Sequence, residues 1–282
     1  MTYQRAIGVL AQHLGCEPTE RAVYERRVAT DPAEYASSML RAGGPELLFV
    51  DDGFPPADVS IGWEELGELA GCPSRPVLRI ERVAQDAVRA EVASARSRGY
   101  AALKTISAYR GGLDLDRPGV REALLAALEA NEATGDPLPV QVHIGFGDAD
   151  LFLPHADPGY LKPLIERFHA TSFVLLHCYP FVRESGWLAH TYGNVYFDLS
   201  LTIPHVSRPG TALAEALELA PVSKLLYASD AATTPELYLL AAVWWRDALA
   251  EVLPEALPAA AADDAAHMIL RENARALYGL SG

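Results

Sequence analysis

Three residues whose side chains could bind a metal ion or move a proton each end a short apolar run: His143, His177 and Asp230. Neutral imidazole is a good ligand for zinc and similar metals. An aspartate beside a metal-bound water can accept the proton of that water and return it to a leaving group, while a histidine outside the ligand set polarises the substrate carbonyl. The three together are typical of metal-assisted hydrolysis. The runs that they end are Leu138–His143, Ser172–His177 and Lys224–Asp230.

These runs have the composition of buried parallel strands. They are short and rich in Val, Leu and aromatic residues, and helical stretches separate them, as in sheets that helices cover on both faces. The carboxyl ends of such strands meet at one rim, and in a closed barrel that rim carries the active site. A single histidine there would more often be a hydrogen-bonded core residue. Three such residues at equivalent positions favour a functional site.

The strand count is one short of a closed barrel. Seven strands are predicted, whereas a barrel of alternating strands and helices needs eight. Two helical stretches, Tyr3–Leu14 and Glu20–Arg41, precede the first predicted strand, so the missing strand would have to lie before Tyr3. We therefore predict an α/β fold, a (β/α)8 barrel of the TIM type without strand 1, with an open edge between the strands near Glu46 and Lys224. The predicted strands are Glu46–Asp51, Pro76–Glu81, Tyr100–Ile106, Leu138–His143, Ser172–His177, Asn194–Ser200 and Lys224–Asp230.

Length and patterning favour one domain. Barrels of this kind reach about 250 residues as a single domain, and no linker, repeat or low-complexity segment interrupts the 282 residues. We predict a single domain over residues 1–282. In it, residues 1–45 form N-terminal helices and residues 46–282 supply barrel strands 2–8 with their helices.

Proline and glycine mark several helix boundaries. Asp157-Pro158 and Thr234-Pro235 each place a capping side chain before a proline at the first helical position. Gly279 is expected to close an amphipathic helix over Ala262–Tyr278. Pro254–Ala262 is predicted to be a loop between helices.

Composition restricts the partners of the chain. A formal net charge of −14 opposes binding to nucleic acid, because that affinity depends on neutralising phosphates with Lys and Arg. The apolar runs fall well short of the roughly 18 residues that span a bilayer, and the first residues carry no apolar signal core. The three cysteines lack a paired spacing. We predict a cytoplasmic protein that acts on a small molecule and does not bind nucleic acid or membrane; a homo-oligomer is left open.

Five segments resemble a known family. They are Val140–Asp148, Leu175–Pro180, Asn194–Ser200, Ala228–Asp230 and Ile269–Leu280, and they occur in family order over nearly the whole chain. The sequence resembles the amidohydrolase superfamily, and within it the amidohydrolase-2 group. It is similar to the domain that is fused to a glutamine synthetase-like domain in fungal developmental proteins.

The resemblance implies roles for the three strand-end residues. His143 would be the metal ligand from the fifth barrel strand, and His177 the histidine of the sixth strand that polarises the substrate. Asp230 would be the aspartate of the eighth strand, at once a metal ligand and the general base. The paired Gly145 and Gly147 would allow a loop to approach the metal closely, because they carry no Cβ.

Two basic residues are candidates for substrate binding. Lys104 stands at the fourth barrel strand, where some superfamily members use a carbamylated lysine to bridge two metals, but a plain ion pair with a carboxylate or with substrate is the alternative. Arg79 is a charged residue in an apolar strand. It would either bind a substrate carboxylate at the rim, because guanidinium matches that shape bidentately, or pair with Glu81.

The sequence departs from the family in one motif. The family's first strand carries a His-x-His pair that supplies two metal ligands, and none of the eight histidines here lies two residues from another. His143 and Asp230 alone do not make a tight zinc site. Three interpretations stay open: the chain begins late, another chain or segment completes the barrel, or the protein has lost the metal and kept the scaffold.

Two classes of function follow from these observations. The leading hypothesis is a metal-dependent hydrolase of a small carboxylated amide or lactone, with zinc, or alternatively manganese, as cofactor and water activated by the metal and Asp230. The alternative is a metal-free or inactive barrel that serves as a binding or regulatory protein. A decarboxylase that uses the same site is a third hypothesis.

Overall fold

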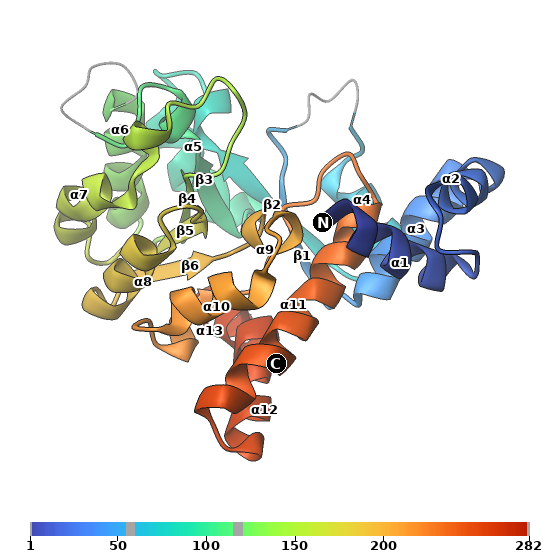
Figure 1. Cartoon of the computed structure of the whole chain (residues 1–282). Coiled ribbons are helices and arrows are strands. Elements are labelled where there is room, and N and C mark those ends of the chain that lie inside the picture. The colour runs from blue at the N-terminus through green and yellow to red at the C-terminus, as the bar shows by residue number, and fades with distance from the viewer. Residues whose placement is uncertain (1, 55–59, 115–120, 281–282) are drawn as a thin grey trace.

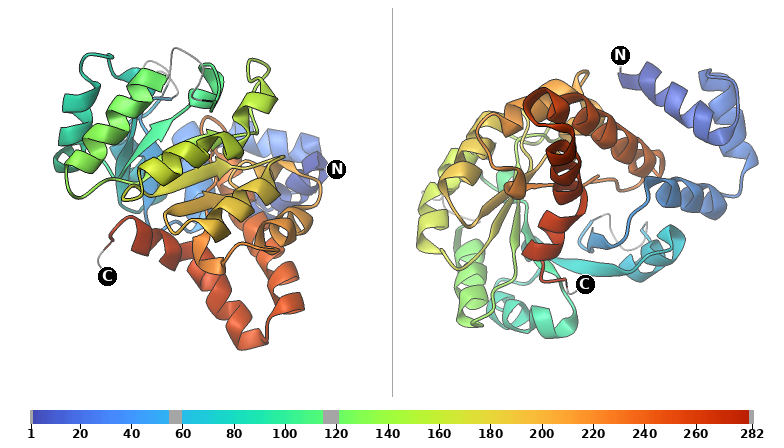
Figure 2. Two further views of the ribbon diagram at one scale, coloured as in Figure 1. Left: turned by 90° about the vertical axis from the view of Figure 1, so that its left-hand side faces the viewer. Right: turned by 90° about the horizontal axis from the view of Figure 1, so that it is seen from below.

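The computed structural model of the chain describes residues 2–54, 60–114 and 121–280. Its centre is one sheet of seven parallel strands in the order β1 to β7, each bonded to the next along the chain (Figure 1). The sheet curls, and helices cover its outer face (Figure 2). All seven predicted strands are confirmed. They are β1 (Leu48–Asp51), β2 (Ser74–Arg79), β3 (Ala102–Thr105), β4 (Val140–Ile144), β5 (Phe173–His177), β6 (Val195–Asp198) and β7 (Leu225–Leu226).

Helices precede the sheet and follow most of its strands. Three helices, α1 to α3, come before β1, and the long helix α11 follows β7 and packs against α3 and α10. The helices are α1 (Thr2–Leu14), α2 (Glu20–Ala29), α3 (Pro32–Gly43), α4 (Trp63–Ala70), α5 (Val88–Ala95), α6 (Arg121–Ala133), α7 (Lys162–Arg167), α8 (Val182–Thr191), α9 (Thr202–His205), α10 (Pro209–Leu217), α11 (Glu236–Ala256), α12 (Ala259–His267) and α13 (Asn273–Leu277).

The two faces of the sheet bury different side chains. Neighbouring residues of a strand point to opposite faces. Val142 and Leu175 belong to the large core that packs against the helices. Val174, Leu176 and Leu226 form a small separate cluster. The sheet therefore has an outer face under the helices and a concave inner face.

The C-terminal segment covers the amino ends of the strands on the inner face. Leu277 of α13 packs on the small inner cluster. The ring of Tyr278 lies 4.3 Å from that of Phe49 in β1, and its hydroxyl accepts a hydrogen bond from Gln141 Nε2 (3.0 Å). Figure 2 (right) shows the C-terminal helices crossing this end of the sheet. The carboxyl ends of the strands face the opposite opening.

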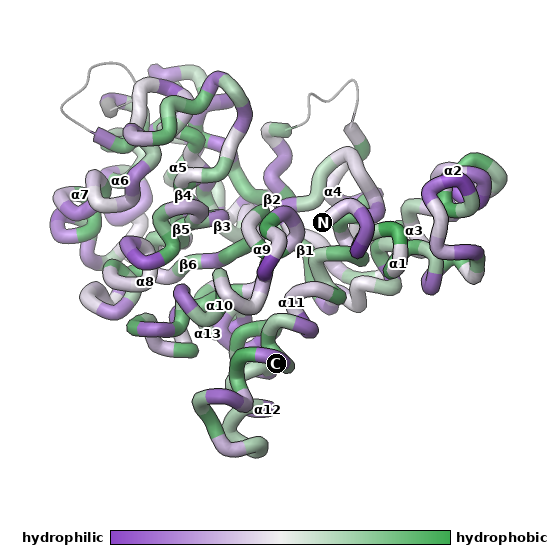
Figure 3. The backbone as a smooth tube through the Cα atoms, in the orientation of Figure 1, coloured by the Kyte–Doolittle hydropathy of each residue, from purple (hydrophilic) through white to green (hydrophobic). Residues whose placement is uncertain are grey.

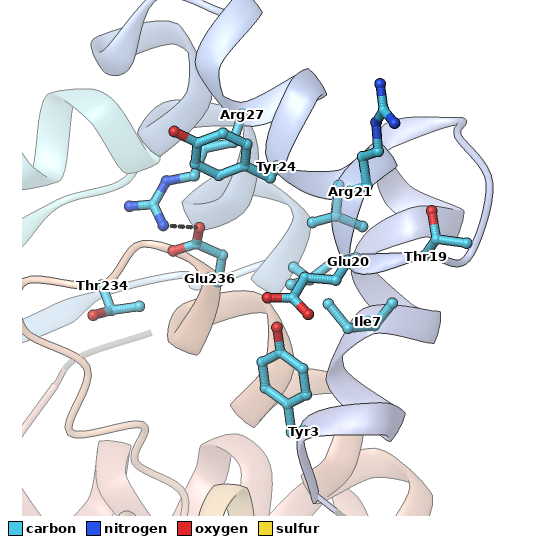
Figure 4. A pocket seen from close by; sticks show the side chains of 11 residues that line it. Tyr3, Ile7, Thr19, Glu20, Arg21, Tyr24, Arg27, Thr234 and Glu236 are labelled. Carbon is cyan, nitrogen blue, oxygen red and sulfur yellow. Dashed lines mark ion pairs between the residues drawn. The ribbon is translucent and has the colours of Figure 1, made fainter.

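The N-terminal helices attach to the start of α11. Arg27 of α2 pairs with the buried Glu236 (Nη1 to Oε1, 3.0 Å), and the hydroxyl of Tyr35 in α3 donates to the same oxygen (3.0 Å). Figure 4 shows this ion pair in the wall of a pocket that Tyr3 and Glu20 also line. Helix α2 buries a single residue, and many of its residues are hydrophilic (Figure 3). The ion pair is therefore an important attachment of this helix.

Several predicted helix boundaries are wrong. The stretch Glu20–Arg41 is divided between α2 and α3, because Asp31 accepts hydrogen bonds from the N–H groups of Ala33 and Glu34 (2.9 and 3.1 Å) and so caps a new helix. Pro32 has no N–H with which to continue the preceding helix. Two helices therefore replace the single predicted stretch.

The C-terminal boundaries also differ from the prediction. The predicted loop Pro254–Ala262 is largely helical: α11 continues to Ala256, and α12 begins at Ala259. Pro254 lies in the last turn of α11, so the one hydrogen bond that its missing N–H removes is lost near the end of the helix and not from its middle. The predicted helix Ala262–Tyr278 is divided by a π-helical turn over Met268–Glu272.

The capping predictions have mixed outcomes. Asp157 is confirmed as a cap, since its Oδ1 accepts from the N–H of Gly159 (2.8 Å). Thr234 is not a side-chain cap of α11; its backbone carbonyl accepts from the N–H of Leu237 instead (3.0 Å). Gly279 has φ +64°, which is the left-handed conformation expected of a residue that closes a helix.

The sheet is open between its first and last strands. Within residues 2–54, 60–114 and 121–280, β1 pairs only with β2, and β7 pairs only with β6. This is the predicted edge, and it leaves backbone N–H and C=O groups without sheet partners. Across the same residues, no helix combines the length and the apolar character that crossing a membrane requires.

We expect the open edge to make the chain associate, because an unpaired strand edge accepts another strand. Val50→Lys, which places a charge on the edge strand β1, should lower the weight-average mass measured by sedimentation at high concentration. Val28→Lys, on the exposed surface of α2, is the matched control and should leave that mass unchanged. A monomer at every concentration, or equal effects of both substitutions, would contradict the expectation.

Candidate active site

The polar residues identified in the sequence lie at the carboxyl ends of the strands. Arg79 ends β2 and is the register partner of Lys104 in β3. His143 lies near the end of β4, His177 ends β5, and Asp230 follows β7 in a loop. Because all of these strands are parallel, the five residues lie at one rim of the sheet.

The two histidines are in direct contact. Nε2 of His177 lies 3.0 Å from Nδ1 of His143, and the ring centroids are 4.5 Å apart. The remaining nitrogen of each ring also has a partner: Nε2 of His143 lies 3.2 Å from the carbonyl oxygen of Gly145, and Nδ1 of His177 lies 2.7 Å from Oγ of Ser200. All four ring nitrogens are therefore hydrogen bonded within the protein.

This contact requires His177 to leave the strand conformation. His143 is the register partner of Leu176, and His177 is the partner of Ile144, so regular strands would point the two histidines to opposite faces of the sheet. His177 has φ +68° and Cys178 has φ +64°, values that residues with a Cβ rarely adopt. The left-handed turn redirects the imidazole of His177 toward His143.

Side chains at and just beyond the end of β6 hold this turn. Oδ1 of the buried Asp198 accepts hydrogen bonds from the backbone N–H groups of His177 (2.8 Å) and Ser200 (2.9 Å). The hydroxyl of Thr202 donates to the carbonyl oxygen of His177 (2.6 Å). Both backbone groups of His177 are therefore bound by neighbouring side chains. These bonds offset the cost of the unfavourable backbone angle.

Asp230 is the accessible acid of the site. Its side chain is 37% exposed, whereas that of His177 is 1% exposed, and its Oδ2 lies 3.9 Å from Nδ1 of His177. Asp230 also has a positive φ of +47°. The structure thus brings His143, His177 and Asp230 together at the rim, as expected, and leaves their chemical roles as predictions.

Burial makes both imidazoles neutral. Burial, and then the neighbouring His177 and Lys104, lower the pKa of His143 to about 2. Burial, and then the charge of Lys104, lower the pKa of His177 well below its ordinary value. Burial raises the pKa of Asp198 to about 6, although the hydrogen bonds from Ser200 and His177 lower it. Neutral imidazole is the form that can act as a ligand or as a proton acceptor.

Arg79 and Lys104 share a carboxylate that the sequence reasoning missed. Nε of Arg79 donates to both oxygens of Asp51 (3.2 and 3.0 Å), and Nζ of the buried Lys104 lies 3.8 Å from Oδ2 of the same residue. The plain ion pair is thus the arrangement seen for Lys104. Substrate binding by either residue stays a prediction. Asp51 was within reach of sequence reasoning, because it ends the first predicted strand.

Arg79 does not use Glu81 as its hydrogen-bond partner. Glu81 instead accepts from the hydroxyl of Thr105 (2.5 Å) and the N–H of Ile106 (2.9 Å). Burial raises the pKa of Glu81. Of the two interpretations that the sequence left open for Arg79, pairing with Glu81 is therefore replaced by the pairing with Asp51.

The loop after β4, which contains Gly145 and Gly147, packs closely against two neighbouring tyrosines. A Cβ on Gly145, which has φ +56°, would lie 2.1 Å from the carbonyl oxygen of Tyr179, and a Cβ on Gly147 would lie 2.2 Å from the hydroxyl of Tyr109. The N–H of Phe146 also donates to the Tyr179 carbonyl (2.7 Å). The glycines therefore let this loop pack against the turn after His177, and the Gly145 carbonyl reaches His143.

The described donors do not fit a complete metal site. Across the described ranges, no group of three or more His, Cys, Asp and Glu side chains is gathered as ligands would be. Catalytic zinc usually takes three protein ligands and a water. His143 and Asp230 would supply two, and the nitrogen of His143 nearest His177 is already hydrogen bonded.

Comparisons with known proteins agree with this fold. The model of the amidohydrolase-2 family, described as amidohydrolase, matches residues 73–280. The chain belongs to the amidohydrolase family.

One curated relative is similar to part of the chain. Protein fluG of Emericella nidulans is 42% identical over 131 residues, which is 45% of this chain and 15% of that protein. The chain thus corresponds to a small part of the length of this relative.

Solved structures share the fold. A Lactobacillus casei ATCC 334 protein, whose suggested role is that of a metal-dependent hydrolase, has a TM-score of 0.85 and 28% identity over 96% of this chain and 83% of its own. A uronate isomerase from Bacillus halodurans C-125 has a TM-score of 0.70 and 14% identity, over 98% and 76% of the two chains. A dihydroorotase from Campylobacter jejuni has a TM-score of 0.58 and 17% identity, over 89% and 79%.

We expect acid to destabilise the metal-free chain through His143. Its pKa falls from 6.5 to about 2 on folding, so below pH 6.5 the unfolded chain binds a proton that the folded chain does not. The contribution of His143 to the free energy of unfolding is complete above pH 6.5. It declines as the pH falls and is about 1.4 kcal/mol smaller at pH 5.5.

Urea unfolding at pH 7.5 and 5.5 should show a larger loss in the wild type than in His143→Asn, which keeps the contribution of His177, whose pKa is also lowered. The exposed His169→Asn is the control. An unchanged pH dependence in His143→Asn would refute the argument.

We expect Gly145→Ala to destabilise the chain more than Gly135→Ala. Gly135 also has a positive φ of +77° but has no atom near its missing Cβ, so its substitution should cost only the left-handed conformation, about 1–2 kcal/mol. Gly145→Ala adds the collision with the Tyr179 carbonyl, for a further loss of about 1–3 kcal/mol. Denaturant unfolding of both variants measures the difference. Equal losses would mean that the loop yields to the added methyl group.

Proposed function

We propose that this chain is a hydrolase of a small molecule, acting on an amide or a lactone, with Asp230 as the general base. One observation supports this most: a single accessible carboxylate lies beside two buried, neutral imidazoles at the carboxyl rim of a parallel barrel sheet. Family membership supports the hydrolase-type role. The Lactobacillus relative supports the same class of reaction.

The proposed chemistry uses Asp230 twice. The carboxylate accepts a proton from water as the water oxygen attacks the substrate carbonyl carbon. It then returns that proton to the nitrogen of an amide, or to the ring oxygen of a lactone, as the bond to carbon breaks. Its exposure gives water and substrate access to it. General acid–base transfer of this kind is worth roughly 10²–10⁴ in rate.

The neighbouring side chains would bind and orient the substrate. His177 is proposed to polarise the carbonyl, which requires its hydrogen bond to His143 to open, because both of its ring nitrogens are occupied. Arg79 and Lys104 are proposed to bind a substrate carboxylate. In that role the two cations would bind the substrate carboxylate and Asp51 at the same time, because Asp51 already pairs with both of them.

A divalent metal, zinc or alternatively manganese, belongs to the proposal through His143 and Asp230. When bound, it would acidify a water and polarise an oxygen of the substrate. A third protein ligand would have to come from a residue other than His143 and Asp230. A cytoplasmic location is likewise a part of the proposal.

A metal-free binding barrel is the second candidate. It is favoured by the hydrogen bonds that occupy all four imidazole nitrogens and by the absence of a three-donor group among the described residues. Elemental analysis of the purified chain separates the two candidates. Zinc or manganese at about one ion per chain is incompatible with the second.

The test of the leading proposal is a set of three variants assayed on a panel of amides and lactones. Asp230→Asn should abolish turnover, because an amide can neither accept nor return the proton, with a loss of at least about 10²-fold. His177→Asn should lower turnover and keep the metal content, and His143→Asn should lower the metal content. Asp247→Asn, exposed on α11, is the matched control for Asp230→Asn.

The pattern across the variants decides the assignment. An active Asp230→Asn enzyme would remove the general base from the proposal. Equal loss of metal in all three variants would mean that the roles of the histidines are assigned wrongly.

A further inference from the structure

Tyr109 belongs to the same rim as His143 and Asp230. It lies in the short turn after β3, and its ring centroid lies 4.8 Å from that of His143. Burial raises the pKa of Tyr109, and the carboxylates of Asp148, Asp150 and Asp230 add to that rise. The phenol ring therefore lies beside a histidine of the candidate active site and within the electrostatic influence of its accessible acid.

The loop after β4 fixes the position of the Tyr109 hydroxyl. The hydroxyl oxygen accepts a hydrogen bond from the backbone N–H of Asp148 (3.1 Å). A Cβ on Gly147 would lie 2.2 Å from the same oxygen, so a larger residue at this position would push the hydroxyl away. The side chain is therefore held from two sides, at its ring by His143 and at its oxygen by the loop.

The proton of this hydroxyl is available to a ligand. A phenolic hydroxyl can donate one hydrogen bond in addition to those it accepts. Within residues 2–54, 60–114 and 121–280, the bond from Asp148 is the one hydrogen bond of the Tyr109 hydroxyl, and in it the hydroxyl is the acceptor. Polar groups that are shielded from solvent usually have a partner. A substrate oxygen at the rim would be such a partner.

Other donors at the rim already have partners inside the protein. Both ring nitrogens of His177, the residue proposed to polarise the carbonyl, are hydrogen bonded. Arg79 and Lys104 are paired with Asp51. Tyr109 can thus donate to a substrate without first giving up a bond within the protein, which His177 cannot do.

We propose that Tyr109 is a catalytic residue whose hydroxyl donates a hydrogen bond to the carbonyl oxygen of the amide or lactone. This role deepens the proposed function and rests on it. As water adds to the carbonyl carbon and gives its proton to Asp230, negative charge grows on the carbonyl oxygen, and the bond from Tyr109 strengthens. Asp230 then returns the proton to the leaving nitrogen or oxygen as its bond to carbon breaks and the carbonyl forms again. The proton of Tyr109 stays on Tyr109 throughout.

The first experiment replaces the carbonyl oxygen by sulfur in the amide or lactone that the wild type hydrolyses fastest. Sulfur is a weak hydrogen-bond acceptor, so the wild type should lose the contribution of the Tyr109 hydroxyl, which Tyr109→Phe has already lost. Tyr109→Phe should lower kcat on the oxygen substrate by about 10²–10³-fold. The ratio of kcat for oxygen over sulfur should be at least about tenfold larger in the wild type than in Tyr109→Phe. Tyr160→Phe, on an exposed tyrosine, is the matched control and should keep the wild-type ratio.

The ratio distinguishes contact with the substrate from a structural role. Tyr109→Phe keeps the ring against His143 and removes the acceptor for the N–H of Asp148. A displaced loop would lower kcat equally for the oxygen and the sulfur substrate. Equal oxygen-to-sulfur ratios in the wild type and in Tyr109→Phe would therefore overturn the proposal.

The second experiment measures binding without turnover. The full chain, labelled with tyrosine that carries ¹³C at Cζ, is titrated with δ-valerolactam, and the NMR signal of Tyr109 is identified by its loss in Tyr109→Phe. The Cζ shift responds to hydrogen bonding of the attached hydroxyl. We expect this signal to move with the lactam and to move less with δ-thiovalerolactam, while the signal that Tyr160→Phe removes stays in place. A Tyr109 signal that does not move at any lactam concentration would also overturn the proposal.

The contact of Tyr109 and the hydrolase can fail separately. A chain whose Tyr109 signal moves with the lactam, but which hydrolyses no amide or lactone, would refute the hydrolase and keep the contact with the carbonyl oxygen. An active hydrolase with equal oxygen-to-sulfur ratios in the wild type and in Tyr109→Phe would refute the role of Tyr109 alone.

Discussion

The left-handed turn at His177 is the constraint on which the site depends. Side chains of a strand alternate between two faces, and the alternation assigns His143 and His177 to opposite faces of the sheet. One residue with a positive φ removes this conflict. The bonds that Asp198 and Thr202 make to the backbone of His177 keep it in place. Side chains at the end of β6 therefore determine where the imidazole of His177, the last residue of β5, lies.

Much of the fold could be predicted from the sequence. All seven strands were found because short apolar runs with helical stretches between them are typical of the buried strands of a parallel sheet. The helices were less well placed. A capping aspartate before Pro32 divides one predicted helix into two, and Pro254 is tolerated in the last turn of α11. Such effects depend on a few local hydrogen bonds rather than on the pattern of apolar residues.

The site was predictable only in its outline. Strand ends identify His143, His177 and Asp230, because the carboxyl ends of parallel strands meet. Residue spacing does not predict the contact between the two imidazole rings, and it does not predict that Asp51 pairs with both Arg79 and Lys104. Both arrangements depend on the directions of side chains on neighbouring strands. The hydrogen bonds that Asp198 and Ser200 make to His177 could not be predicted either, because their segment has the pattern of an ordinary strand end.

The ion pair between Arg27 and Glu236 gives the N-terminal helices a role beyond packing. Glu236 begins α11, the helix into which the chain passes directly after the loop that carries Asp230. The hydroxyl of Tyr35 holds the same carboxylate from α3. Contacts from α2 and α3 thus hold the first residue of α11, the helix that follows the loop carrying Asp230. Loss of Arg27 from α2 would therefore remove a contact at the start of the helix that follows the loop of Asp230, although Arg27 itself belongs to a different helix.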